Sequence, residues 1–135
     1  MRKEKGEREV KKLGVLGDKT YSFAIRIIKA YKFLSGKSEF VLSKQLLRSG
    51  TAIGALCREA QNAQSKADFL NKMNIALKEA NETEYWLSLL KDTEYIDVQI
   101  YESMNADCEE IVKILTSTVK TTKKNIDHEK SESKK

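Results

Sequence analysis

The segment Leu42–Leu90, LSKQLLRSGTAIGALCREAQNAQSKADFLNKMNIALKEANETEYWLSLL, decides the fold of this chain. It contains no proline, and apolar residues recur at helical spacing on both sides of a joint at residues 62–64. The second stretch opens with the spacing of a capping box. In such a box the Ser65 hydroxyl accepts from the Asp68 backbone N–H, and the Asp68 carboxylate accepts from the Ser65 N–H. The segment therefore predicts an antiparallel helical hairpin.

Two further helices are expected, one on each side of this hairpin. Before it, apolar residues recur over residues 19–35, and Gly36 ends that helix. The expected inner face of this first helix consists of Ala24, Ile27, Ile28, Tyr31 and Leu34. Ser38 is the expected N-cap of the next helix, and Asp97 is the expected cap of a last helix that runs to about Thr122. Four helices with short connections predict an all-α, antiparallel up-down-up-down four-helix bundle.

The ends of the chain differ in composition from this bundle. A chain of 135 residues is about one domain. We expect a charged N-terminal arm over residues 1–17, the four-helix bundle over residues 18–122, and a disordered, Lys-rich tail over residues 123–135. No apolar region follows the N-terminus, and no stretch reaches the roughly 20 apolar residues that span a bilayer. The sequence thus predicts a cytoplasmic protein without membrane contact.

Charge is divided unevenly along the chain. The formal net charge is +5, but the two charged ends together contribute +6 and the body from Asp18 to Val119 carries −1. Within the body, residues 18–62 carry +5 and residues 63–119 carry −6. One predicted hairpin is therefore basic and the other is acidic.

Basic side chains follow two lines along the first two predicted helices. These candidates for nucleic-acid binding are Lys19, Arg26, Lys29, Lys37, Lys44, Arg48 and Arg58. Contacts to phosphates need only cations at suitable spacing, so such lines can supply sequence-independent, salt-sensitive binding to RNA or single-stranded DNA. The alternative is that these side chains form ordinary solvated helix faces.

Some of these cations are also expected in ion pairs within the bundle. If the second and third helices fold back about Ala63, residues equidistant from it along the chain come together. This geometry places Arg58 near Asp68. It also places Arg48 near Glu79 or Glu82, and such pairs would fix the register of the hairpin.

Two glycines inside the second predicted helix require an explanation. Gly50 and Gly54 each cost roughly 1 kcal/mol of helix propensity relative to alanine. With Ala52 and Ala55 they form a small-residue patch against which another helix can pack closely. The alternative is a mildly weakened surface helix. Trp86 lies beside the inner stripe of the third helix, where it can face the fourth helix or a neighbouring subunit.

The sequence offers few groups for catalysis, so we expect no enzyme, no metal and no cofactor. Its single histidine, His128, lies in the expected tail, and Cys57 and Cys108 are expected to be buried thiols. There is no Glu-x-x-His pair, no Cys-x-x-Cys and no glycine-rich phosphate loop. A metal-dependent enzyme using the carboxylates of the third helix is the remote alternative, and those carboxylates are Glu79, Glu82 and Glu84.

Residues 41–55, 58–63, 65–69 and 75–87 resemble the bacterial "four helix bundle protein" family. Its members include proteins encoded in intervening sequences of large-subunit ribosomal RNA genes. They are similar to the accessory variability determinant of diversity-generating retroelements. The resemblance implies a four-helix protomer that assembles into a closed ring, typically a pentamer. In the retroelement relatives it also implies a basic barrel that binds nucleic acid and a reverse transcriptase.

The charge division is consistent with assembly into a ring. A ring needs head-to-tail contacts between two different patches, and a basic hairpin facing an acidic one suits such closure. We expect Gly50, Gly54 and Trp86 at or near the seams between copies. The leading hypothesis is a non-enzymatic ring-forming scaffold that binds RNA or single-stranded DNA. The alternative is a protein-interaction adaptor, such as an accessory subunit of a reverse transcriptase, with no direct nucleic-acid role.

Overall fold

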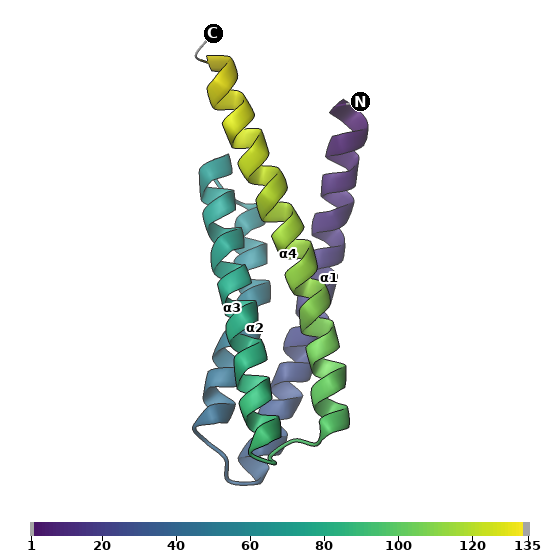
Figure 1. The fold of residues 1–135 in the computed structure, drawn as a ribbon, viewed down its shortest axis with the longest axis vertical. Coiled ribbons are helices and arrows are strands. Elements are labelled where there is room, and N and C mark those ends of the chain that lie inside the picture. The colour runs from purple at the N-terminus through teal and green to yellow at the C-terminus, as the bar shows by residue number, and fades with distance from the viewer. Residues whose placement is uncertain (1, 134–135) are drawn as a thin grey trace.

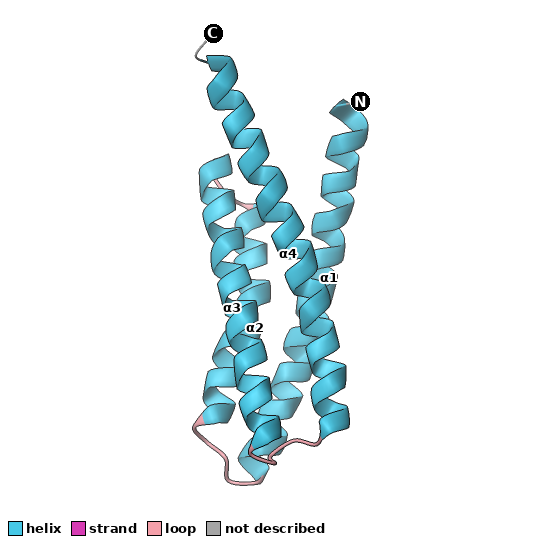
Figure 2. Cartoon of the chain, in the orientation of Figure 1, coloured by secondary structure: helices cyan, strands magenta, loops and turns pink. Residues whose placement is uncertain are grey.

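The computed structural model describes residues 2–133, and its side chains are described from residue 13 onward. Its elements are α1 (Arg2–Gly36), α2 (Leu42–Gln61), α3 (Lys66–Asp92) and α4 (Val98–Ser133). Neighbours in the chain run antiparallel, and α1 also packs against α4 (Figure 1). The connections are short loops at the two ends of the rods (Figure 2). The predicted all-α, up-down-up-down four-helix bundle is confirmed.

The core is a single column of apolar side chains to which all four helices contribute. Its fully buried members include Leu16, Phe23, Ile27, Leu34, Leu46, Ile53, Met73, Leu87, Leu90, Ile111 and Leu115. The expected inner face of α1 was partly wrong, because Ile28 is 40% exposed whereas Phe23 is buried. The helix is rotated so that Leu16 and Phe23 share the inner face with Ile27. The core therefore extends further toward the N-terminus than the sequence pattern suggested.

Both terminal helices continue beyond their expected limits. α1 includes Gly14 and Gly17, which were expected in an arm, and Leu16 beside them is buried in the core. α4 continues through most of the expected disordered tail, and residues 134 and 135 lie outside the described part. Thr122 is still buried there, and an ion pair between Lys66 and Glu129 ties the extension to α3. Continued packing and pairing thus offset the polar composition of this segment.

Glu39 caps α2 in place of the predicted Ser38. The Glu39 carboxylate accepts from the backbone N–H groups of Val41, Leu42 and Ser43 at 3.1, 2.9 and 2.6 Å. Ser38 has a φ of 64° and lies in the turn that closes α1. Burial of Glu39 raises the pKa of its carboxyl, but the three backbone hydrogen bonds outweigh burial and hold the pKa below its ordinary value of 4.5. The carboxylate supplies the anion that satisfies the free N–H groups of this helix end.

The predicted caps of α3 and α4 are confirmed, with one change of partner. The Asp68 N–H donates to the Ser65 hydroxyl at 3.0 Å, and the Ile100 N–H donates to the Asp97 carboxylate at 2.7 Å. The Asp68 carboxylate accepts from the Gln64 N–H at 3.3 Å rather than from that of Ser65. The reciprocal half of the capping box is therefore made one residue before the N-cap.

Gly50 allows α1 and α2 to pack closely. It is buried, and a Cβ added there would lie 2.6 Å from Cγ1 of Ile27, which is itself fully buried. A Cβ at Gly54 would lie 3.3 Å from the hydroxyl of Thr20. Both glycines thus serve the contact between two helices of one protomer.

Over residues 13–133 no helix has a long enough apolar stretch to cross a membrane.

Replacing Gly50 by alanine should lower the free energy of unfolding by about 1–2 kcal/mol. Overpacking costs typically 1–3 kcal/mol, and the gain in helix propensity offsets only part of this cost. Gly14→Ala is the matched control, because nothing lies within 4 Å of a Cβ at that exposed position. The control should gain up to about 1 kcal/mol. Denaturant unfolding checks both values, and a Gly50→Ala variant as stable as the wild type would contradict the close contact.

Replacing Glu39 by alanine should destabilise the protein by about 1–2 kcal/mol at neutral pH, because three N–H groups lose their acceptor. The folded pKa of Glu39 lies below its ordinary value. The stabilisation is therefore fully present above about pH 4.5 and is lost as the pH falls through the folded pKa. Unfolding measured across this range should show the difference between wild type and variant shrink in acid. Glu102, which is exposed on α4, provides the control, and Glu102→Gln should leave the stability unchanged.

Candidate functional site

Two of the predicted nucleic-acid-binding cations join α1 to α4. Lys19 Nζ lies 2.7 Å from Glu110 Oε2, and Arg26 Nη1 lies 2.5 Å from Asp107 Oδ2. Arg26 also donates to the hydroxyl of Ser103 at 3.0 Å. The hydrogen bond between Lys19 and Glu110, with their mutual attraction, raises the pKa of Lys19 and lowers that of Glu110. These two cations are neutralised within the protomer.

A third predicted cation, Arg48, joins α2 to α3. Its guanidinium lies 3.1 Å from Glu79 Oε2 and 2.6 Å from Glu82 Oε1. The hydrogen bond to Glu82 is the largest cause that raises the pKa of Arg48. Beneath this network the buried Thr83 hydroxyl donates to the hydroxyl of Ser49 at 2.9 Å. The structure thus brings Arg48 together with both acids that the hairpin spacing placed near it.

The pair expected between Arg58 and Asp68 is not formed. Arg58 is exposed and lines a groove of about 970 Å³ between α1 and α2, whereas the Asp68 carboxylate caps the hairpin turn. The ion pair that crosses from α2 to α3 near this end joins Glu59 to Lys72 at 3.5 Å. Cys57 faces the core, and Arg58 is the next residue of the helix. This position places Arg58 on the side of α2 that faces α1. Equal distance from the turn predicts the level of a residue but not the side it faces.

The remaining predicted cations gather where α1 meets α2. Four exposed residues, which we call the loop-end lysines, surround the α1–α2 connection: Lys29, Lys32, Lys37 and Lys44. No ion pair joins any of them to an acid in the described residues. Lys37 Nζ lies 4.5 Å from the centroid of the Phe33 ring. The candidates predicted from the sequence included three of these lysines but not Lys32.

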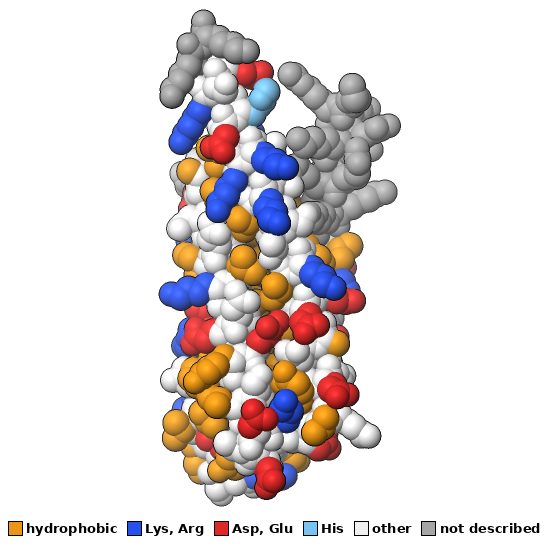
Figure 3. All heavy atoms as spheres, viewed as in Figure 1, with side chains coloured by type: hydrophobic (Ala, Val, Ile, Leu, Met, Phe, Trp, Pro, Cys, Tyr) orange, Lys and Arg blue, Asp and Glu red, His pale blue; other side chains and the backbone are white. Residues whose placement is uncertain are grey.

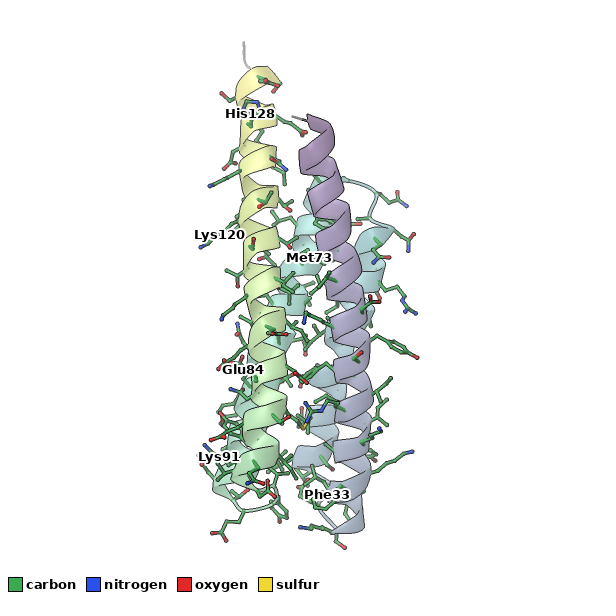
Figure 4. All side chains as sticks on the ribbon, turned by 90° about the vertical axis from the view of Figure 1, so that its right-hand side faces the viewer. Phe33, Met73, Glu84, Lys91, Lys120 and His128 are labelled. Atoms are coloured by element: carbon green, nitrogen blue, oxygen red, sulfur yellow. The ribbon has the colours of Figure 1, made fainter. Side chains whose placement is uncertain are left out.

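A second group of exposed lysines lies on the last turns of α4. Figure 3 shows blue side chains gathered over the upper part of this helix, whereas red and blue mix further down. Its exposed members are Lys120, Lys123, Lys124 and Lys130. Figure 4 shows Lys120 directed away from the bundle. The sequence pattern predicted no site at any of them, and it placed Lys123, Lys124 and Lys130 in a disordered tail because the polar composition there did not predict a continued helix.

The three residues expected at seams between copies have different surroundings. Gly50 is buried against Ile27 inside the protomer, and this contact already explains why the residue has no side chain. Gly54 is half-buried and lines the α1–α2 groove together with Ala55. Trp86 is half-buried on α3, where its indole N–H donates to Glu82 at 3.4 Å. Gly54 and Trp86 therefore remain available to a neighbouring copy.

The nucleophiles and carboxylates of the chain do not form a reactive cluster in residues 13–133. Burial raises the pKa of both Cys57 and Cys108 to about 12, so both thiols are protonated. His128 is exposed on α4 and lies 3.0 Å from Glu132. Glu79 and Glu82 bind Arg48, and no group of three potential metal ligands is found over the described part. Burial, reinforced by nearby Glu109, raises the pKa of Glu84.

Comparison with known proteins identifies the family. The family model described as 23S rRNA-intervening sequence protein matches residues 12–117. The chain belongs to this family. No curated protein matches the chain significantly.

A solved structure related to this member of the 23S rRNA-intervening sequence family shares its fold. It is the crystal structure of a protein with unknown function from the S23 ribosomal protein family of Bacteroides thetaiotaomicron VPI-5482. The two sequences are 62% identical, the alignment covers 81% of this chain and 98% of the other, and the TM-score is 0.79. The family resemblance carried by residues 41–87 is confirmed.

Proposed function

We propose that this protein is a non-enzymatic scaffold that binds RNA or single-stranded DNA through the loop-end lysines. The single observation that carries the proposal is that these four lysines are exposed and unpaired among the described residues. Three of the other predicted cations are bound by acids of the bundle itself. The family is named for an intervening sequence of 23S ribosomal RNA, which makes RNA the first ligand to test. The expected cytoplasmic location is part of the proposal.

Phosphates are the chemistry that such a surface fits. Each lysine that contacts a phosphate releases condensed counterions, so binding requires no base sequence and weakens steeply with salt. The acids of the α3–α4 half repel a polyanion from that side of the bundle. A ligand would therefore approach the end of the α1–α2 hairpin.

Neutralising loop-end lysines should weaken nucleic-acid binding and flatten its salt dependence. The test variant carries three changes to glutamine, at Lys29, Lys32 and Lys44. The control variant carries the same number of changes at ion-paired lysines outside this end of the bundle, namely Lys19, Lys66 and Lys72. For labelled single strands, the salt slope of the test variant should fall by about 2, at roughly 0.7 per lost phosphate contact.

The control separates a local site from net charge. It should bind like the wild type, because the acids of the bundle already neutralise those lysines. Equal losses in both variants would show that net charge alone drives binding and would contradict the proposed site. Weak, salt-independent binding by the wild type would instead favour the adaptor hypothesis, in which the target is another polypeptide such as a reverse transcriptase.

We also propose that copies of the bundle assemble head to tail into a closed ring, with the pentamer that the resemblance implies as the expected form. Apolar side chains on the outer face of α1 support this proposal, since Tyr21, Ile25 and Ile28 are 60%, 41% and 40% exposed. Tyr21 also lines the small-residue groove to which Gly54 and Ala55 contribute. The opposite charges of the two hairpins suit contact between different faces of adjacent copies.

Sedimentation at micromolar concentration and moderate salt should show a closed oligomer. The double variant Ile25→Asp/Ile28→Asp should sediment as a folded monomer, because both side chains are exposed within the protomer and charge there opposes contact between copies. Lys78→Asp, on the exposed face of α3, is the control and should leave the oligomer intact. A wild-type protein that sediments only as a monomer would contradict the ring.

A further inference from the structure

Exposed aromatic rings lie among the loop-end lysines. Phe33 is 46% exposed at the end of α1, and Phe40 is 51% exposed in the α1–α2 connection. Figure 4 shows Phe33 at the lower end of the bundle. Phenylalanine rings in these positions contribute little to the core and leave apolar faces in contact with water. Such rings are suited to contact a planar ligand.

Phe33 also borders a groove between the end of α1 and the beginning of α4. The groove has a volume of about 660 Å³, which is within the range of small-ligand sites. Phe33 and Lys37 line one wall, and Tyr95, Val98 and Ile100 line the other. These three apolar residues are 37%, 56% and 40% exposed. The groove therefore offers an apolar space beside an aromatic ring.

Cations flank this ring along α1. Lys29 lies four residues before Phe33 on α1, on the same helix face and about 6 Å of rise away, and Lys37 follows directly after the helix ends at Gly36. The Lys37 ammonium already lies 4.5 Å from the ring centroid. An aromatic platform between cations is the arrangement by which proteins hold single strands, with bases stacked on rings and phosphates on basic side chains.

Acids lie across the groove from these cations. Asp92, Glu94 and Asp97 contribute to its lining from the end of α3 and the α3–α4 connection. Lys91 lines the same side and is paired with Asp92 at 3.6 Å, so the acids outnumber the cation there. Carboxylates repel phosphates, but they accept hydrogen bonds from base edges and from the ribose 2′-hydroxyl. A strand would therefore place its phosphates along α1 and its sugar and base edges toward the acids. The 2′-hydroxyl provides a donor that a DNA backbone lacks, so this wall favours RNA.

We propose that this end of the bundle binds single-stranded RNA by stacking an unpaired base on Phe33, with phosphates held by Lys29 and Lys37. The inference rests on the proposed nucleic-acid-binding function and adds strand selection to it. Bases of a duplex are stacked on one another and cannot reach the ring, so the site selects unpaired RNA.

The experiment compares ring variants on RNA of one sequence in single-stranded and duplex form. Wild-type protein should bind the single strand about tenfold more tightly than the duplex. Phe33→Leu, which keeps an apolar side chain without the ring face, should lose about tenfold in affinity for the single strand. Phe33→Trp should retain the affinity, because it keeps a stacking surface. Tyr85→Leu, the same kind of change at an exposed aromatic residue on α3 outside this groove, is the control and should bind as the wild type does.

A base-analogue reporter and a DNA strand complete the test. Fluorescence of 2-aminopurine in the RNA should be quenched by the wild type and by Phe33→Trp, but not by Phe33→Leu. Equal binding by wild type and Phe33→Leu, equal affinity for strand and duplex, or tighter binding of the DNA strand would each overturn the inference while leaving the proposed function intact. Absence of wild-type binding to every nucleic acid would overturn both. A polypeptide that binds the wild type in place of RNA, and that Phe33→Leu no longer binds, would identify the end as a protein-docking surface and overturn the inference.

Discussion

The contact between Ile27 and Gly50 sets the rotation of α1, and the charged surfaces of the bundle follow from that rotation. The missing Cβ of Gly50 leaves a space that the buried Ile27 side chain fills. With Ile27 directed inward, the adjacent Arg26 reaches α4, and Lys19, about two turns earlier, reaches the same helix. A side chain larger than glycine at position 50 would force α1 to move and would disturb those pairs.

Acids of α4 meet this cationic face of α1 along only part of its length. Glu110 and Asp107 neutralise its upper part, whereas the first turns of α4 contribute Val98 and Ile100 to the groove beside Phe33. The same helix face is thus a structural seam in its upper half and an open surface near the α1–α2 connection. One stripe of residues can therefore carry both a structural seam and the proposed binding surface.

The sequence predicted best what depends on short range. The α2–α3 hairpin, the Ser65 cap and the level at which Arg48 meets α3 all follow from a short turn and the regular rise of two helices. The side that Arg58 faces depends on the rotation of α2, which long-range packing determines. The cap from Glu39 was missed because glutamate is not a usual N-cap, and here it reaches the helix end from outside the first turn.

The sequence also could not distinguish cations that are paired with acids from cations that are unpaired. Lys19, Arg26 and Lys29 have no acid three or four residues away, so local spacing treats them alike. Only the packing of α4 against α1 separates the two neutralised cations from the open one. The α1–α4 pairing joins residues far apart in the chain, and no turn of fixed length links them.

The helical continuation of α4 changes what its terminal amines can do. A disordered segment loses conformational freedom when it binds, and that entropy opposes association. Lys120, Lys123 and Lys124 instead project from a rod already ordered by buried Thr122 and by the bond between Lys66 and Glu129. Their relative positions are already fixed by the helix. A polyanion that spans them would therefore bind without the entropy cost of ordering this segment.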